Sequence, residues 1–400
     1  MKKYEKFNND IINDLTLSNI ETWREIPKPP MDNLTELNHM FMKSSIFLIL
    51  SLAIEDIYKK KIDYKKFKNI LLGHSYIRFL LKDINIRLLK KMKANDIIEY
   101  LSKNGKQITK KEKQYIQNYY EYSFEKFIWN IASTITNRLD FESFRMYLKE
   151  RNEINTIEKI EKNFEQWEKE NYNNKHTKDM SGFENLIKKF KPIYKFFYRT
   201  TFQQRWNGYA FNKKLTIGEH QILVLLSYLK YKDNIEQKEL NSNEIKINSL
   251  NLLYHDLVEG FTKDINSPVK NIGNIRSILE ELEEEILDEE FFSYMPSKMS
   301  NYLKNKIDIL HPFDKDKKIK DGIIEKKLGK KMDDYTAYLE ALYNSKLGNK
   351  LDYIQNACQG IIDKYKNDPN MIVTIQNLNI ILKTELNFNI PKEENNLKNF

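Results

Sequence analysis

Apolar residues recur at three- and four-residue steps along most of the chain, a spacing typical of α-helices with one buried face. The segment 40–57 is almost continuously apolar and predicts a buried helix. The segments 71–91 and 92–150 continue the pattern, the first with one break and the second with Trp129 turned inward. The first part of the chain therefore predicts an all-α fold.

A polar interval interrupts the helical pattern near the middle of the chain. Residues 149–180 are highly charged, and their end is rich in Asn, Lys and Ser, as linkers often are. We therefore expect one helical domain over 1–164, a linker over 165–182 and a second helical domain over 183–400. A length of 400 residues also favours two domains, because single cores rarely grow that large.

The second domain has a similar hydrophobic pattern. From it we expect a turn at 205–211, a long helix over 218–232, the solvated face of a core helix over the acidic run 279–290, a polar loop over 311–322 and a helix over 331–349. Gly348 and Asn349 would end the last helix, since both residues adopt left-handed backbone easily.

The composition narrows the class of protein. Gly (11) and Pro (9) are scarce, which favours helices over turn-rich β folds. The single cysteine, Cys358, excludes a disulfide framework and fits a reducing compartment. The start of the chain has no apolar run of signal-peptide length, and the longest apolar run, 45–54, is about half the length that spans a bilayer. We expect a soluble, cytoplasmic protein that does not bind membranes.

The net charge of +9 is distributed unevenly, with +11 in residues 1–200 and −2 in residues 201–400 when Lys and Arg are counted against Asp and Glu. An excess of positive charge in one part can indicate nucleic acid or another anionic partner. A Lys-rich chain also scatters solvated charge in this way, and we favour this simpler interpretation. Nucleic acid is thus an alternative partner and not the expected one.

Candidate chemistry is concentrated in the segment 252–270, LLYHDLVEGFTKDINSPVK. Within it, His255 and Asp256 are adjacent in an apolar, helix-like setting. His220, at the start of a Leu-rich helix, and Asp333, near the start of a later one, also fall on faces expected to be buried. Two imidazoles and two carboxylates would form a mixed N/O site, which suits Mn, Co, Fe or Mg better than a structural zinc.

Other residues near this segment could act on a phosphate. Glu259 lies one helical turn after His255 and could position or deprotonate an attacking water. Arg205 and Lys270 are candidate phosphate contacts, because guanidinium and ammonium groups match its charge. A lone His–Asp pair or a lone buried His is usually structural, so the interpretation depends on the whole combination.

The order of these motifs resembles that of the HD-domain phosphohydrolases, and within them the branch of bacterial 5′-deoxynucleotidases. The resemblance covers about 205–351. It is carried by Arg205 and Trp206 before Glu219 and His220, by His255 and Asp256 followed by Glu259, by the tail Thr262, Asp264, Ile265, Pro268, Val269 and Lys270, and by Asp333 followed by Ala337, Tyr338, Leu339, Ala341 and Leu342.

This resemblance implies an all-α fold that holds one divalent metal through His220, His255, Asp256 and Asp333. It also implies that Glu259 and Asp264 are the catalytic carboxylates and that Arg205 contacts the phosphate or sugar. Trp206 and Lys270 are expected to contact the substrate as well.

Two positions depart from the family pattern. Lys263 stands where the family usually has Gly, and Gln221 follows the Glu-His pair where the family usually has Ser. Neither change removes a ligand, but both leave the substrate open. Asp333 has a second carboxylate beside it, Asp334, and the register of the AYL motif selects Asp333.

The first domain contains a second version of the pattern. The segment 71–90, LLGHSYIRFLLKDINIRLLK, aligns with the segment from Leu252, so that His74 matches His255 and Asp83 matches Asp264. Upstream, His39 matches His220, and Arg24 lies fifteen residues before His39 as Arg205 does before His220. Such agreement indicates two tandem HD-type domains related by internal duplication.

The first copy lacks key groups. Ser75 replaces the ligand Asp256, and Arg78 replaces Glu259, so the copy has lost an anionic ligand and gained a cation. Glu121 is the loosely aligned counterpart of Asp333. We expect domain 1–164 to be an inactive, degenerate copy. Its favoured role is a scaffold that forms a pseudo-dimer within the chain, in place of a homodimer; the alternative is an anionic effector bound by Arg24, His39, His74 and Arg78.

The expected function is hydrolysis of a nucleotide phosphate, with a deoxynucleoside 5′-monophosphate as the leading substrate. Hydrolysis of a nucleoside triphosphate to triphosphate and cleavage of a cyclic or linear phosphodiester are the alternatives within the HD class. A non-catalytic nucleotide sensor or interaction protein is the alternative from another class. The second copy keeps every expected ligand, which favours the enzyme.

Overall fold

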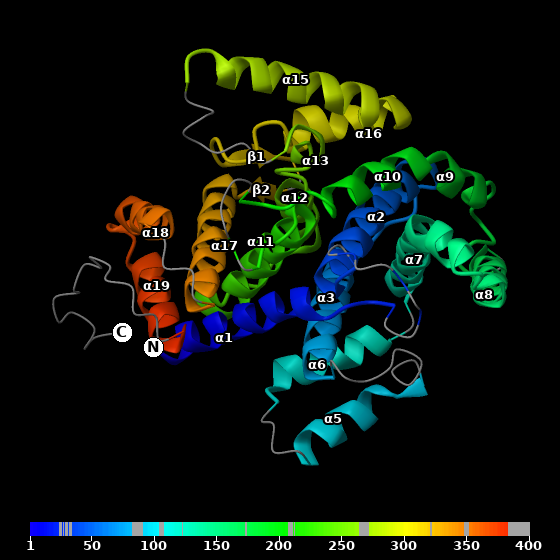
Figure 1. The fold of residues 1–400 in the computed structure, drawn as a ribbon, viewed down its shortest axis with the longest axis horizontal. Coiled ribbons are helices and arrows are strands. Elements are labelled where there is room, and N and C mark those ends of the chain that lie inside the picture. Colours follow the sequence, from blue (N-terminus) through cyan, green and yellow to red (C-terminus); the bar gives the residue numbers. More distant parts are fainter. Residues whose placement is uncertain are drawn as a thin grey trace.

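The computed structural model is built almost entirely of helices (Figure 1). It describes residues 1–400 apart from 24, 25, 27, 29, 30, 32, 33, 82–90, 104–107, 122, 173, 207–210, 212, 264–271, 321, 348–351 and 383–400. We refer to residues 1–164 as the first half and to residues 183–400 as the second half.

The helices of the first half are α1 (Lys2–Thr16), η1 (Leu17–Asn19), α2 (Glu36–Ile57), α3 (Tyr64–Leu80), α5 (Ala94–Lys103), α6 (Lys110–Tyr120), α7 (Phe124–Glu150) and α8 (Ile154–Tyr172). The elements of the second half are α9 (Phe183–Lys189), α10 (Lys191–Thr200), α11 (Ile217–Tyr231), η2 (Lys232–Glu236), α12 (Ser242–Leu253), α13 (Glu259–Thr262), α15 (Ile275–Glu290), η3 (Phe292–Tyr294), α16 (Ser297–Asn301), η4 (Tyr302–Ile307), β1 (Lys317–Ile319), β2 (Gly322–Ile324), α17 (Lys326–Lys346), α18 (Asp352–Tyr365) and α19 (Pro369–Leu382). The all-α fold class is confirmed.

Two helices, α2 and α11, form the centre of the molecule. Both are apolar on nearly every side, and a helix of this kind must be covered all round. They pack against each other closely at Gly218, where an added Cβ would lie 2.8 Å from the Phe41 ring. One continuous hydrophobic core contains residues of both halves. The halves thus share a core at the α2–α11 contact.

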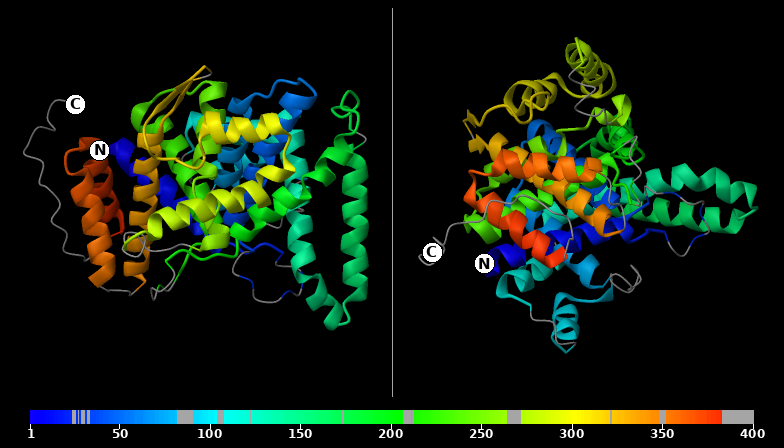
Figure 2. Two further views of the ribbon diagram at one scale, coloured as in Figure 1. Left: turned by 90° about the horizontal axis from the view of Figure 1, so that it is seen from above. Right: turned by 60° about the vertical axis from the view of Figure 1, so that its left-hand side comes forward.

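The N-terminal helix also connects the halves. The ring of Phe7 on α1 lies 5.7 Å from that of Tyr231 on α11 and 5.3 Å from that of Tyr335 on α17. Asn8 donates a hydrogen bond to the carbonyl of Thr374 on α19. Figure 1 shows α1 running below the second-half helices, while α7 and α8 form a long hairpin on the other side of the molecule, which projects clearly in Figure 2.

Three expectations about single elements need comment. Helix α8 extends to Tyr172, eight residues into the stretch expected to be a linker. The polar loop expected over 311–322 is wrong in part, because β1 pairs with β2 there in an antiparallel hairpin. The acidic run is helical as expected, but it is no core helix: Leu287 is its one buried residue, and Ile278 is 60% exposed.

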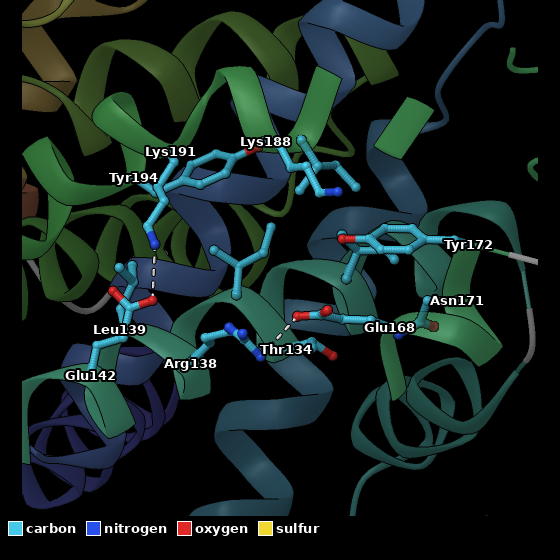
Figure 3. A pocket seen from close by; sticks show the side chains of 13 residues that line it. Thr134, Arg138, Leu139, Glu142, Glu168, Asn171, Tyr172, Lys188, Lys191 and Tyr194 are labelled. Carbon is cyan, nitrogen blue, oxygen red and sulfur yellow. Dashed lines mark hydrogen bonds and ion pairs between the residues drawn. The ribbon is translucent and has the colours of Figure 1, made fainter. Parts of the chain in front are cut away.

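A cavity of about 230 Å³ lies between α7, α8 and the α9–α10 segment (Figure 3). Ion pairs between Arg138 and Glu168 and between Lys191 and Glu142 lie at its edge. None of its lining residues belongs to the predicted site, so this cavity is separate from the candidate chemistry. In the part of the chain that the structure describes, no helix is long and apolar enough to cross a membrane.

Candidate metal centre

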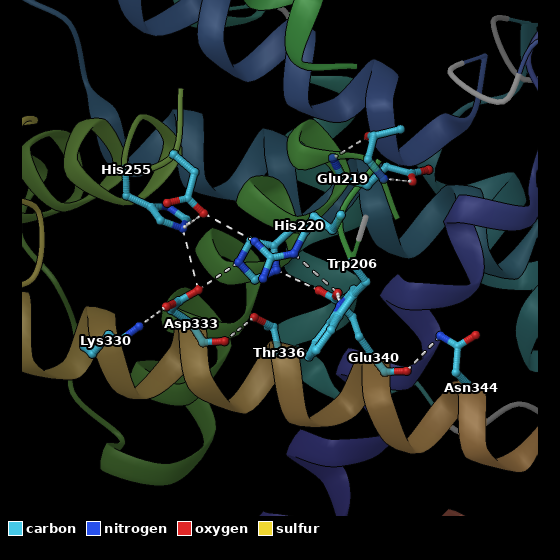
Figure 4. Close-up of polar contacts among 12 residues, drawn as sticks. Trp206, Glu219, His220, His255, Lys330, Asp333, Thr336, Glu340 and Asn344 are labelled. Carbon is cyan, nitrogen blue, oxygen red and sulfur yellow. Dashed lines mark hydrogen bonds and ion pairs between the residues drawn. The ribbon is translucent and has the colours of Figure 1, made fainter. Parts of the chain in front are cut away.

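The four predicted metal ligands come together from three places in the second half. Figure 4 shows three of them, His220, His255 and Asp333. His220 lies in the first turn of α11, His255 and Asp256 lie between α12 and α13, and Asp333 lies in the second turn of α17. One ligand atom from each of these residues lies within 4.8 Å of the others.

The start of α11 fixes the position of His220. Thr216 and Glu219 form a reciprocal capping box, which anchors the first turn of the helix. The His220 side chain is fully buried, its Nε2 lies 2.8 Å from Asp333 Oδ1, and its Nδ1 lies 2.7 Å from Glu340 Oε1. Each imidazole nitrogen therefore has a carboxylate partner.

We expected His255 and Asp256 to lie within a helix, but they lie in a turn between two helices. Helix α12 ends at Leu253, and α13 begins at Glu259. With its amide oxygen facing the turn, the Gln221 side chain accepts hydrogen bonds from the backbone N–H groups of Asp256 and Leu257 at 3.0 Å. A Ser side chain at this position would be shorter than that of Gln221. The departure from the family pattern thus supplies the hydrogen bonds that hold the turn.

The turn also orients the His255 ring. Its Nδ1 donates to the carbonyl oxygen of Leu252 at 2.7 Å. This leaves Nε2 toward the carboxylates, 3.0 Å from Asp256 Oδ2 and 3.7 Å from Asp333 Oδ1. The Phe313 ring lies 5.0 Å from the imidazole ring, on the side of the polar loop that precedes β1. A backbone hydrogen bond on one nitrogen is a common way to present the other to a metal.

Close opposite charges shift the pKa values of this cluster. Burial alone would lower the pKa of His255, but the carboxylates of Asp256 and Asp333 outweigh burial and raise this pKa to about 10. The pKa values of both Asp256 and Asp333 lie below their usual range despite burial, the first because of His255 and the second because of Lys330 and His220. A buried group of two imidazoles and two ionised carboxylates fits a divalent metal with N/O preference.

Arg205 and Trp206 lie beside the cluster. Arg205 Nη1 is 3.3 Å from Asp256 Oδ2, and its Nε is 3.5 Å from Glu340 Oε2. Trp206 Nε1 donates to Glu340 Oε2 at 2.8 Å. The guanidinium is thus close enough to the ligand group to contact a phosphate held there.

Of the two predicted catalytic carboxylates, Glu259 lies within the described residues and Asp264 does not. Glu259 is buried at the start of α13, and its backbone N–H donates to the carbonyl of Asp256 at 3.1 Å, which fixes it next to the ligand turn. Asp264 and Lys270 lie outside the described residues. Lys263, the other departure from the family pattern, has φ 66° and ψ 159°. Only glycine adopts this backbone region readily, which gives a physical reason for the family's glycine.

Two residues of α17 belong to the site but were missed from the sequence. Glu340 lies two helical turns after Asp333 on the same face and holds His220, Trp206 and Arg205. Lys330 lies one turn before Asp333, and its Nζ is 2.5 Å from Asp333 Oδ2. The available signal was the spacing of these charged residues, three positions before and seven positions after Asp333, on a helix with an otherwise apolar face.

The first-half residues form two groups. His39 pairs with Asp140, while His74 Nε2 and Arg78 Nε both contact Glu36, at 2.7 and 2.9 Å. Two further described residues join neither group: Ser75 donates to Asp14, and Glu121 is exposed and pairs with Lys66. Arg24 and Asp83 lie outside the described residues. The exposed position of Glu121 gives no support to its alignment with Asp333, which stays a prediction.

Comparison with known proteins finds a family similar to part of the second half. No curated protein matches the chain at a significant level. Residues 192–375, a little under half of the chain, match the family described as 5′-deoxynucleotidase YfbR-like. All four clustered ligands, Glu259 and Glu340 fall within the matched segment. The second half of the chain is therefore a nucleotide phosphohydrolase, similar to the metal-dependent 5′-deoxynucleotidases of that family.

Proposed function

We propose that the second half removes the 5′-phosphate from deoxynucleoside monophosphates, using one divalent metal held by His220, His255, Asp256 and Asp333. The observation that carries this proposal is the convergence of these four ligand atoms within 4.8 Å inside the segment that matches the family. When bound, a metal such as Mn, Co, Fe or Mg would polarise the phosphoryl group and lower the pKa of water.

The protein's own residues would then divide the remaining work. Arg205 would contact the phosphate, because its guanidinium already lies against a ligand carboxylate. Glu259 would accept the proton of the attacking water while the water oxygen bonds to phosphorus. Asp264 would support the leaving 5′ oxygen, and Trp206 and Lys270 would contact the nucleotide.

We infer that the first half is a degenerate copy of the second. Three parallels support this. Trp23 and Trp206 both have φ 57°. Two residues before each tryptophan, the backbone forms an isolated β-bridge to the threonine that caps α2 or α11. Trp23 Nε1 donates to Asp140 as Trp206 Nε1 donates to Glu340.

In addition, each central helix has a histidine paired with a buried carboxylate, His39 with Asp140 through Nε2 and His220 with Glu340 through Nδ1. The bridges Glu21–Thr35 and Gln204–Thr216 favour Thr22 over Arg24 as the counterpart of Arg205. Counting back two turns from Asp140 gives Ser133 at the place of Asp333. By this register the first half would lack the phosphate contact and a second metal ligand.

The contact between the halves supports an intrachain pseudo-dimer, with 1–164 as scaffold and 183–400 as the catalytic domain. Thr35, the N-cap of α2, donates to Glu219 of α11 at 2.6 Å, and Thr216, the N-cap of α11, donates to Asn38 of α2 at 2.7 Å. Such a reciprocal exchange is typical of interfaces related by a two-fold axis. In a pair of this kind, the first half of the chain takes the place that a second subunit would have in a dimer.

The test is metal analysis of the purified protein, followed by phosphate release from mono-, tri- and cyclic nucleotides with Mn or Co. We expect a metal per chain and release from deoxynucleoside 5′-monophosphates. The variants His255→Ala and Asp256→Ala should lose both metal and turnover, whereas activity in both variants would refute the site. Release from triphosphates or cyclic nucleotides alone would correct the substrate, and retained metal without any release would favour a nucleotide sensor.

A further inference from the structure

The carboxylate of Glu340 is the centre of a buried arrangement that no motif predicted. We propose that Glu340 is a positioning residue: it holds His220 with Nε2 toward the metal and holds Arg205 beside the same site. This inference rests on the proposed function and identifies a residue that sets both metal affinity and substrate binding.

Glu340 is 2% exposed, so solvent does not satisfy its charge. Its oxygens instead face nitrogen atoms of three side chains, two of which, His220 and Trp206, are labelled in Figure 4. Oε1 lies 2.7 Å from His220 Nδ1, while Oε2 accepts from Trp206 Nε1 at 2.8 Å and lies 3.5 Å from Arg205 Nε. An ionised carboxylate accepts hydrogen bonds only, so the two shorter contacts require protons on His220 Nδ1 and Trp206 Nε1, whereas the contact with Arg205 is an ion pair.

The contact with His220 determines which nitrogen can bind a metal. A proton held on Nδ1 by Glu340 leaves the lone pair of Nε2 available. Nε2 is the nitrogen that lies with His255, Asp256 and Asp333 in the ligand group, 2.8 Å from Asp333 Oδ1. Carboxylate partners of this kind orient a ligating histidine and raise its basicity.

The same carboxylate also contacts Arg205, the residue proposed to bind the phosphate of the substrate. The guanidinium spans from Glu340, through Nε, to the ligand carboxylate of Asp256, through Nη1. Fixing Nε orients the fork of η nitrogens, which are the groups that bind phosphate oxygens. A change at Glu340 should therefore affect metal binding and nucleotide binding together.

The first half offers a matched control in Asp140. This buried carboxylate accepts from Trp23 Nε1 at 3.0 Å and pairs with His39, and Tyr198 Oη donates to it at 3.0 Å. Asp140→Asn thus changes the same chemistry on the equivalent face of α7, away from the clustered metal ligands. It controls for the loss of a buried carboxylate as such.

The experiment compares Glu340→Gln, Glu340→Asp and Asp140→Asn in the full-length chain. Mn²⁺ affinity is measured by calorimetric titration of metal-stripped protein, with melting temperature and nucleotide kinetics at saturating Mn²⁺ alongside. We expect Glu340→Gln to weaken Mn²⁺ binding about 10- to 100-fold. It should also raise KM more than it lowers kcat, because Arg205 loses its anchor. Glu340→Asp, which keeps the charge, should recover part of the affinity.

Asp140→Asn should lower the melting temperature and leave Mn²⁺ affinity unchanged. If Glu340→Gln lowers only the melting temperature and binds Mn²⁺ like wild type, Glu340 is structural and the inference is overturned. If that variant does not fold, wild-type affinity in Glu340→Asp overturns it equally. A wild-type protein that takes up no Mn²⁺ would instead remove the proposed function itself, so the two failures are distinguishable.

Discussion

Two buried histidines, one in each half, have pKa values displaced in opposite directions. Burial lowers the pKa of both, and each imidazole contacts carboxylate groups. For His74 the added repulsion of Lys43 outweighs Glu36, and the pKa falls to about 3. For His255 the carboxylates of Asp256 and Asp333 outweigh burial, and the pKa rises to about 10.

The difference is one of charge balance. In the first half, Glu36 already has two buried cations, Lys43 at 3.6 Å and Arg78 at 2.9 Å, so the network carries its own counterions. These contacts favour the scaffold interpretation over an effector site, because the cations are committed to Glu36. In the second half two carboxylates lie around two imidazoles, and Lys330 and Arg205 each contact one of these carboxylates, at 2.5 and 3.3 Å. The ligand atoms there also lie close enough together to hold a divalent metal, and among the described residues the first half has no such cluster.

The largest predicted effect concerns Glu259, whose counterpart in the sequence alignment is the cation Arg78. Glu259→Gln should lower kcat about 100- to 10,000-fold, because the attacking water loses its proton acceptor. The variant should keep its metal, since Glu259 is not among the four clustered ligands. Single-turnover phosphate release and Mn²⁺ titration of the same preparation test this. Loss of Mn²⁺ along with activity would make Glu259 a ligand.

Most of the metal centre followed from the sequence, and the reason is local. His255, Asp256 and Glu259 are near neighbours, His220 lies in the first turn of a capped helix, and Asp333 lies two turns into a helix that hydrophobic spacing indicates. Their burial is a consequence of apolar helix faces, which a single sequence records well.

What the sequence could not give depends on which helix faces which. Glu340 reads as one more charged residue on an amphipathic helix until α17 is placed against α11. The turn between α12 and α13 was predicted as helix, because its apolar residues keep helical spacing and the Gln221 contact that satisfies it comes from another element. The register of the first copy shifted for the same reason: Trp23 and Asp140 pair across 117 positions of the chain.

Arg78→Met should reveal how strongly the first half depends on its own cations. It leaves Glu36, which is 1% exposed, without one of its two close cations, and breaking a buried ion pair of this kind costs about 3–5 kcal/mol of unfolding free energy. Urea unfolding of the full chain measures it. Lys103→Met, which breaks an exposed pair with Glu99, should barely move the midpoint. Unchanged stability in Arg78→Met would show that Glu36 is not held ionised by this pair.

The acid stability of the protein should report on His74. Its pKa is about 3 in the folded chain, compared with an ordinary value of 6.5. Between these values the unfolded chain binds a proton that the folded chain does not. Stability should therefore fall as the pH drops through this window, by up to about 1.4 kcal/mol per pH unit. His74→Gln should remove this component when urea midpoints are compared at pH 7 and pH 4 in the same metal state. Equal slopes for the two proteins would contradict a neutral buried His74.

The smallest predicted effect concerns Lys263, which follows α13 in the second half. Its backbone angles, φ 66° and ψ 159°, lie in a region that costs a residue with a side chain of order 1–3 kcal/mol. Part of that strain is offset in any glycine variant by the greater freedom of the unfolded chain. Lys263→Gly should therefore raise the unfolding free energy by about 1 kcal/mol, measured by urea unfolding.

Gln237→Gly is the matched control, because Gln237 also has positive φ, 52°, but its ψ of 33° places it in the left-handed helical region that other residues tolerate better. Its change in stability should be smaller than that of Lys263→Gly. Equal changes in the two variants would mean that Lys263 is not specially strained, and the glycine usual at this position would then need an explanation in the substrate and not in the backbone.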